Sequence, residues 1–277
     1  MITVSSADIN LWIAGLLWPL TRILALITAA PLFGNSAVPV SVKVSLGVLL
    51  AMIVAPAVPA LPAADPMSLA GLLILLQEML VGLAMGFTIR VVFAAVEMAG
   101  EISSLTMGLG FATFFDPNTR GRSSAISQFL SLVATMAFLA LNAHLVLLSA
   151  LVESFSTLPI SATPVYAGGF KQMADWGGVV FSTGVQLSLP IVGALLITNV
   201  ALGVLTRAAP QLNLFGIGFP ITLGVGLLVI AVTLPYLGTP VQNLFLNGIE
   251  RVRLMPRTWS QRPPPAASPP APAPLRP

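Results

Sequence analysis

Six long apolar segments run through this chain of 277 residues, and they restrict its possible folds more than any other feature. A helix needs roughly 20 apolar residues to cross the hydrocarbon core of a bilayer. Strands of a membrane barrel would be about 10 residues long and would alternate in polarity, which these segments do not. The segments cover residues 9–33, 40–61, 69–96, 125–152, 179–206 and 214–237. The sequence therefore predicts an all-α polytopic membrane protein.

Charged residues make up only 8% of the chain, whereas hydrophobic residues make up 56%. Because a soluble domain carries about 25% charged residues, most of this surface must face membrane lipids or other protein. The twelve basic residues form no stripe with interleaved aromatic residues, so nucleic acid is not expected as a partner.

The sequence lacks cysteine and the signature motifs of common hydrolase active sites. The chain has no cysteine and a single histidine, His144, so neither a thiol nucleophile nor a His/Cys zinc site is expected. It has no HExxH or GxSxG motif. We therefore expect that the protein is not an enzyme and that it binds no cofactor or metal. His144, close to Asn142, is interpreted as a hydrogen-bonded structural group rather than a proton relay.

Single prolines interrupt the first, fifth and sixth apolar segments. They are Pro19, Pro190 and Pro220. Proline removes a backbone donor and clashes with the preceding turn, but membrane helices tolerate it where neighbouring groups satisfy the freed carbonyls. Two interpretations remain: local kinks, or helices that bend to fit a larger assembly.

The composition changes after the last apolar segment. Arg251, Arg253 and Arg257 follow it, as expected for a cytoplasmic flank under the positive-inside rule. From Met255 onward proline recurs with little apolar bulk, which favours an extended, solvated chain. We therefore predict a helical membrane domain over residues 1–250 and a basic, proline-rich disordered tail over residues 251–277.

Five charged residues within or next to the apolar segments form a candidate buried charge network: Arg22, Glu78, Arg90, Glu97 and Glu101. If residues 69–107 form one helix, Glu97 and Glu101 lie within about 20° of Arg90 around its axis. Arg90 and Glu97 are about 10 Å apart along that axis, too far to pair directly, so a cation on another helix is favoured. Arg22 and Lys43 are the candidates. Alternatively, Glu97 and Glu101 mark the point where the helix enters water.

A pair of glycines in the third segment, Gly82 and Gly86, has the spacing that lets another helix approach closely.

The most unusual stretch is residues 104–122, which read SLTMGLGFATFFDPNTRGR. Glycines loosen the helix, phenylalanines cluster, and Asp-Pro signals a turn. Exposed Phe and Met normally mark contact surfaces, so two interpretations compete: an interfacial re-entrant loop, or a flexible hydrophobic plug. The candidate residues are Met107, Gly108, Leu109, Gly110, Phe111, Phe114, Phe115, Asp116 and Pro117.

Four blocks in order, within residues 10–250, resemble FliR, the family of flagellar export-gate subunits related to the injectisome T subunit. The blocks are residues 18–34, 99–117, 140–160 and 199–223. The last contains the most distinctive part of the resemblance: Pro210, Gln211, Asn213 and Phe215.

The resemblance implies a fold of kinked helical hairpins in an export-gate assembly with FliP and FliQ, at the flagellar basal body in the bacterial inner membrane. In this family the assembly forms the portal through which unfolded export substrates enter the channel, with FlhB wrapped near its cytoplasmic side and FlhA below. The resemblance also implies that Met107–Pro117 helps plug the closed pore, with Met107, Phe111, Phe114 and Phe115 as blockers. The Pro210–Phe215 block is assigned to a helix break and subunit packing.

A polytopic secondary transporter of a small solute is the alternative function. Its sequence cue would be paired interrupted segments in two similar halves, which this sequence does not have. Transport of a solute by the isolated protein would favour it.

Overall fold

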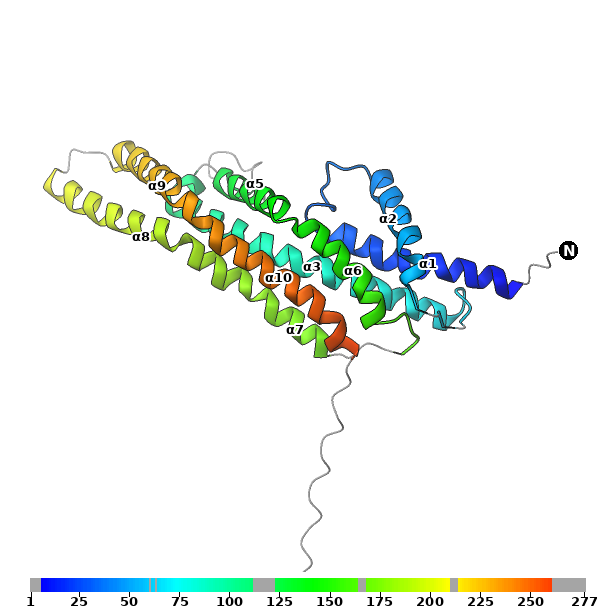
Figure 1. Cartoon of the computed structure of the whole chain (residues 1–277). Coiled ribbons are helices and arrows are strands. Elements are labelled where there is room, and N and C mark those ends of the chain that lie inside the picture. The colour runs from blue at the N-terminus through cyan, green and yellow to red at the C-terminus, as the bar shows by residue number, and fades with distance from the viewer. Residues whose placement is uncertain are drawn as a thin grey trace, which may run out of the picture.

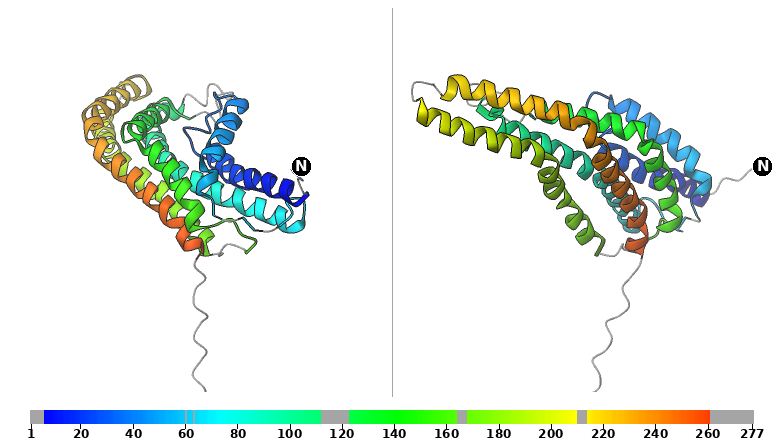
Figure 2. Two further views of the ribbon diagram at one scale, coloured as in Figure 1. Left: turned by 45° about the vertical axis from the view of Figure 1, so that its right-hand side comes forward. Right: turned by 60° about the vertical axis from the view of Figure 1, so that its left-hand side comes forward.

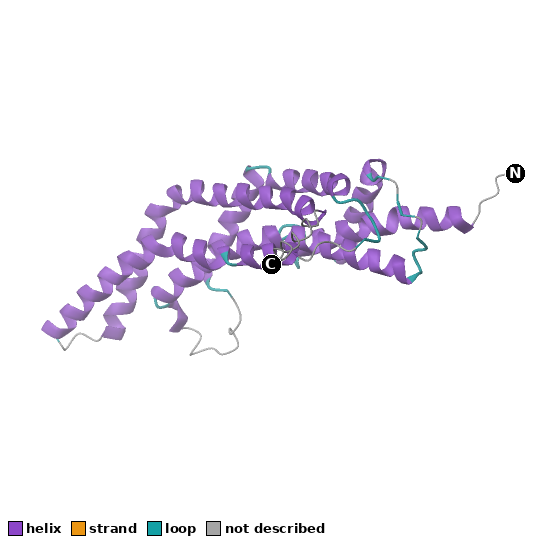
Figure 3. Cartoon of the chain, turned by 90° about the horizontal axis from the view of Figure 1, so that it is seen from below, coloured by secondary structure: helices purple, strands orange, loops and turns teal. Residues whose placement is uncertain are grey.

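The computed structural model describes residues 6–59, 61–62, 64–111, 123–163, 168–209 and 214–260. Every regular element in these ranges is helical (Figure 3). The α-helices are α1 (Ser6–Ala29), α2 (Val40–Val54), α3 (Leu69–Thr106), α5 (Ala125–Ala140), α6 (Ala143–Thr157), α7 (Gly168–Gly177), α8 (Val179–Ala208), α9 (Phe219–Thr233) and α10 (Gly238–Ser260). Short 3-10 or π turns are η1 (Ala55–Ala57), η2 (Leu109–Phe111), η4 (Leu214–Gly218) and η5 (Leu234–Leu237). The predicted all-α class is confirmed.

The long helix α3 organises the molecule, because α1, α5, α8 and α10 all pack against it (Figure 1). It begins where the Ser68 hydroxyl accepts a hydrogen bond from the Gly71 amide at 3.1 Å, a favourable N-cap. Its 38 residues carry apolar side chains toward several neighbours. At its centre the rings of Phe93, Phe138 and Phe245 join α3, α5 and α10, with centroids 5.3–5.6 Å apart.

The predicted glycine contact is present between α3 and α1. A Cβ on Gly82 would overlap the Arg22 backbone carbonyl, and one on Gly86 would lie 2.6 Å from Cβ of Ala29. Only glycine at these two positions lets the helices come so close.

Each predicted apolar segment corresponds to a helix or helix pair. Among the described residues, five helical stretches are long and apolar enough to cross a membrane, and the pair α5 and α6 makes a sixth if counted as one span. That pair is bent by 65°, which the sequence did not predict for a single segment over 125–152. Asn142 occupies the bend with φ of 52°, a left-handed conformation that asparagine tolerates better than most residues.

Two of the three predicted proline breaks lie inside helices: Pro19 in α1 and Pro190 in α8. Pro220 lies in the first turn of α9, directly after the π turn η4. The sixth segment therefore changes from π to α geometry next to this proline.

The helical region extends beyond the predicted boundary after residue 250, which falls inside α10. Val252, Met255 and Trp259 are buried against the rest of the molecule. Their spacing of three and four residues places them on one helix face. Residues 251–260 are thus part of the helical fold, and 261–277 lie outside the described residues.

Candidate functional site

Arg22 and Glu78 form a fully buried ion pair between α1 and α3. The Arg22 Nε donates to Glu78 Oε2 at 2.7 Å, and its Nη2 donates to Oε1 at 2.9 Å. Both side chains have no solvent exposure. This two-pronged geometry matches a guanidinium to a carboxylate, which makes the pair stronger and more directional than a single contact.

The Arg22 guanidinium also connects this pair to α6. Its Nη1 donates to the Ser154 hydroxyl at 3.0 Å, and its Nη2 donates to the Leu158 carbonyl at 3.0 Å. The guanidinium carbon lies 4.4 Å from the centre of the Phe155 ring, a cation–π distance. One buried arginine therefore fixes three helices relative to one another.

The other three members of the predicted network lie apart from this pair. Arg90 is exposed, whereas Glu97 and Glu101 are half-buried on α3. Lys43, the second candidate cation, donates to the Gly34 carbonyl at 3.0 Å. Within the described residues, the structure brings only Arg22 and Glu78 of the five together as an ion pair.

Glu97 and Glu101 bind the start of α5. Glu101 Oε1 accepts from the Ser124 amide at 2.8 Å, and Glu97 Oε1 accepts from the Ser131 hydroxyl at 3.0 Å. A carboxylate at a helix N-terminus is stabilised by the free amides and by the helix dipole. These carboxylates hold α5 against α3, a role that no within-helix spacing could have indicated.

The described start of the predicted plug is attached to α9. Met107 is fully buried, and its carbonyl accepts from the Thr222 hydroxyl at 3.2 Å. Its side chain lies against Gly226, where an added Cβ would be 2.5 Å from the Met107 Cγ. Gly108 follows with φ of 88°, which a residue with a side chain rarely adopts. The chain thus leaves α3 through a turn that requires glycine.

Leu109 and Gly110 continue from this turn and are partly buried. For Phe111 and Phe215 the structure describes the backbone, in η2 and η4. The remaining predicted site residues lie outside the described ranges: Phe114, Phe115, Asp116, Pro117, Pro210, Gln211 and Asn213.

His144 differs from its interpretation as a hydrogen-bonded group. Its Nδ1 is buried and has no hydrogen-bond partner in the described structure, while its ring lies 6.4 Å from that of Phe138. Among the described residues, no three His, Asp or Glu side chains come together as a metal site would require.

The chain is similar to bacterial proteins of one family along most of its length. Residues 13–248 match the family described as "Bacterial export proteins, family 1". The "Flagellar biosynthetic protein FliR" of Pectobacterium carotovorum subsp. carotovorum is 43% identical over 245 residues, which cover 88% of this chain and 94% of that protein. The protein of the same name from Escherichia coli (strain K12) is 40% identical over the same shares. That from Bacillus subtilis (strain 168) is 31% identical over 84% of this chain and 90% of its own length.

Proposed function

Because the chain belongs to the bacterial export proteins of family 1, together with relatives named flagellar biosynthetic protein FliR, we propose that it is a structural and gating subunit of the flagellar type III protein export channel. In this proposal it joins FliP and FliQ in the portal through which unfolded substrates enter. FlhB and FlhA are its further neighbours. The complex sits at the flagellar basal body in the bacterial inner membrane. The family description names export, not a catalysed reaction.

The large apolar surface of the α8–α9 hairpin is the observation that carries the subunit role. The two helices run side by side and extend beyond the rest of the molecule (Figure 2). Their outward side chains include Ile197, Leu228 and Phe181, which are 73%, 66% and 65% exposed. Contiguous apolar surfaces of this kind mark contacts with protein or lipid. Neighbouring subunits such as FliP and FliQ would cover them.

The Pro210–Phe215 block follows α8 in the sequence and ends within η4. We assign Pro210, Gln211, Asn213 and Phe215 to a helix break and to packing against a neighbouring subunit. Gln211→Ala and Asn213→Ala variants should then co-purify less FliP and FliQ. Normal assembly of both variants would refute this assignment.

Residues Met107–Pro117 are proposed to close the resting pore as a soft hydrophobic seal. Methionine and phenylalanine fill irregular gaps, and a narrow apolar constriction excludes water and ions. The attachment of Met107 to α9 and the turn at Gly108 support this role, because they fix where the segment begins. Phe111, Phe114 and Phe115 would supply the blocking side chains.

The test is a deletion of residues 110–117, which keeps the packed Met107 and the turn at Gly108. A deletion of equal length within 261–277 serves as the matched control. Cells with the first deletion should become leaky to small ions, and cells with the second should not. Co-purification with FliP and FliQ establishes that each variant assembles.

Three results would count against the proposal. Wild-type ion conductance in a plug deletion that assembles would remove the gating role. A chain that purifies alone, from cells that still build flagella without it, would remove the subunit role. Transport of a small solute by the isolated chain in liposomes would instead favour a secondary transporter.

A further inference from the structure

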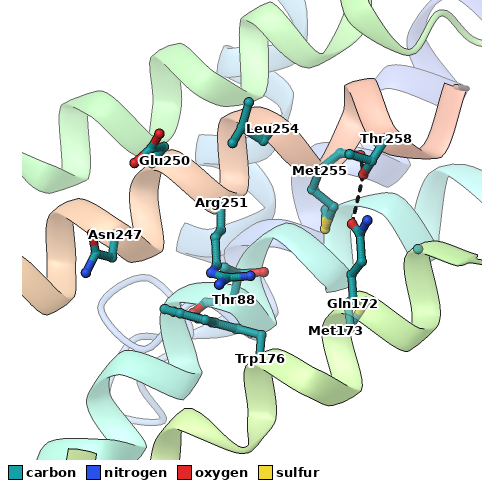
Figure 4. Close-up of a pocket in the computed structure, with 11 residues that line it drawn as sticks. Thr88, Gln172, Met173, Trp176, Asn247, Glu250, Arg251, Leu254, Met255 and Thr258 are labelled. Atoms are coloured by element: carbon teal, nitrogen blue, oxygen red, sulfur yellow. Dashed lines mark hydrogen bonds between the residues drawn. The ribbon is translucent and has the colours of Figure 1, made fainter.

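A pocket of about 640 Å³ opens between α3, α7 and α10 (Figure 4). This volume lies within the range of small-molecule sites, about 300–1,000 Å³. Its floor is Trp176, and Met173 and Met255 add apolar surface. The polar side chains that line it come mainly from α7 and α10.

Arg251 lies over the face of Trp176, with its guanidinium carbon 4.4 Å from the ring centre. The indole is itself fixed, because its Nε1 donates to the Thr88 carbonyl at 3.0 Å. Within the described part of the chain, no carboxylate comes within ion-pair distance of Arg251. A stacked, preoriented guanidinium therefore keeps its N–H donors for another group.

The other polar groups around Arg251 are suited to an anion. The Gln172 Oε1 accepts from the Thr258 hydroxyl at 3.0 Å, which leaves its amide nitrogen as a donor. Asn247 lines the same pocket with a second side-chain amide. Glu250 is the one acidic residue of the lining, and its side chain points away from Arg251 in Figure 4.

The surroundings of the pocket match the polar boundary of a membrane. Phe170 and the buried Trp259 pack at an angle of 42°, with ring centres 5.3 Å apart, beside the polar side chains of the pocket. Phe170 and Leu254 are 43% and 45% exposed, so apolar surface adjoins the polar pocket.

The balance of charge favours an anionic ligand at this end of the molecule. Lys171, Arg251, Arg253 and Arg257 lie on α7 and α10, whereas the acidic residues of these two helices are Asp175 and Glu250, and Glu153 of α6 pairs with Arg257 at 2.9 Å. Basic pockets between membrane helices on the cytoplasmic side bind anionic lipid headgroups.

We propose that the pocket between α3, α7 and α10 binds the headgroup of an anionic phospholipid. Arg251 contacts the phosphate through its N–H groups while it remains stacked on Trp176, and Gln172 and Asn247 supply further donors. The acyl chains lie along the apolar surface next to Phe170 and Leu254. None of the residues that line the pocket belongs to the proposed plug or to the α8–α9 hairpin.

The full-length protein, co-purified with FliP and FliQ, is reconstituted in phosphatidylcholine vesicles that contain a minor fraction of brominated lipid. Bromine near the top of the acyl chain quenches nearby tryptophan, and the Trp176→Phe variant identifies the share of quenching that belongs to Trp176. Brominated phosphatidylglycerol should quench Trp176 more than brominated phosphatidylcholine at the same mole fraction. Lipid that merely surrounds the protein should quench Trp176 to the same extent whichever of the two lipids is brominated.

Arg251→Gln should raise the phosphatidylglycerol fraction needed for half-maximal quenching by about tenfold or more, the loss expected for one charge-assisted hydrogen bond. Arg253→Gln is the matched control: it removes the same charge two residues away, outside this pocket, and should keep the wild-type response. If Arg251→Gln does not fold, Gln172→Ala, an exposed residue, should still weaken the response.

The proposal would be overturned if the two brominated lipids quenched Trp176 equally. It would also be overturned if Arg251→Gln and Arg253→Gln weakened the response to phosphatidylglycerol equally. Inorganic phosphate added to the vesicles distinguishes the source of the phosphate. If millimolar phosphate changes the Trp176 fluorescence while brominated phosphatidylglycerol quenches it no more than brominated phosphatidylcholine does, the pocket binds free phosphate rather than lipid, and the proposal is refuted.

Discussion

Replacing Arg22 with alanine should destabilise the protein far more than the loss of any charge on α1 or α3 other than its partner Glu78. The substitution removes four hydrogen bonds, to Glu78, Ser154 and Leu158. It also leaves the Glu78 carboxylate buried without a cation. Breaking a buried pair by removing one partner costs about 3–5 kcal/mol.

That cost can be measured by thermal unfolding of the purified protein in detergent. At about 2–4 °C per kcal/mol for chains of this size, Arg22→Ala should lower the Tm by roughly 6–20 °C. Arg90→Ala is the control, because Arg90 is an exposed arginine of α3. An exposed substitution is expected to stay within about 0.5 kcal/mol.

A double variant, Arg22→Met with Glu78→Leu, separates the charge from the packing. With both charges gone, nothing buried remains uncompensated except the Leu158 carbonyl, because the Ser154 hydroxyl keeps its bond to the Leu151 carbonyl at 2.6 Å. Apolar replacement of a buried pair is often neutral or stabilising, so the double variant should regain most of the lost Tm. A double variant as unstable as Arg22→Ala would refute the electrostatic explanation, and an Arg22→Ala variant that unfolds like Arg90→Ala would refute any structural role of the pair.

Three further outcomes follow from local geometry. Gly82→Ala should lower the free energy of unfolding, measured with a chemical denaturant, by about 1–3 kcal/mol, because its Cβ would overlap a backbone carbonyl of α1. Gly193 has open space around it, so Gly193→Ala should instead stabilise α8 by up to about 1 kcal/mol. Gly108→Ala should cost about 1–2 kcal/mol, because its φ of 88° is strained for any residue with a side chain; an unchanged Tm would show that this turn readily takes another conformation. Glu101→Gln should lower the free energy of unfolding by about 0.3–1 kcal/mol at low salt and by less at high salt, because it removes a negative charge from the N-terminus of α5. A loss of stability that does not depend on salt would contradict the helix-dipole explanation.

The sequence predicted which charges matter better than it predicted their partners. Arg22 and Glu78 each lie inside an apolar segment, where an unpaired charge is costly, so a buried role could be inferred from the residues alone. Periodicity relates positions only within one helix, however, and these two are 56 residues apart. The choice among Glu78, Glu97 and Glu101 depends on how α1 crosses α3, which is fixed by the glycine contact at Gly82.

Two other features escaped the sequence analysis for different reasons. The bend at Asn142 leaves no mark on hydropathy, because one asparagine in an apolar run is compatible with a straight or a broken helix. The end of α10 did carry a signal, since Val252, Met255 and Trp259 repeat on one face. Pro256 and the prolines that follow favoured a tail, yet proline is tolerated inside α10.

The lengths of the helices bear on whether this chain can exist alone in a bilayer. At 1.5 Å per residue, the 38 residues of α3 are about 57 Å long, against a hydrocarbon core of about 30 Å. To lie wholly within that core α3 would have to tilt by about 58°, beyond the range of about 0–40° seen for membrane helices. Part of α3 therefore extends past the hydrocarbon, and α1, α5, α8 and α10 cover it. The neighbouring α8 packs against α3 and α9, but only 11% of its most apolar stretch is buried. If α8 leaves the lipid alongside α3, the proposed neighbouring subunits would have to cover its apolar side chains, because their exposure to water is unfavourable.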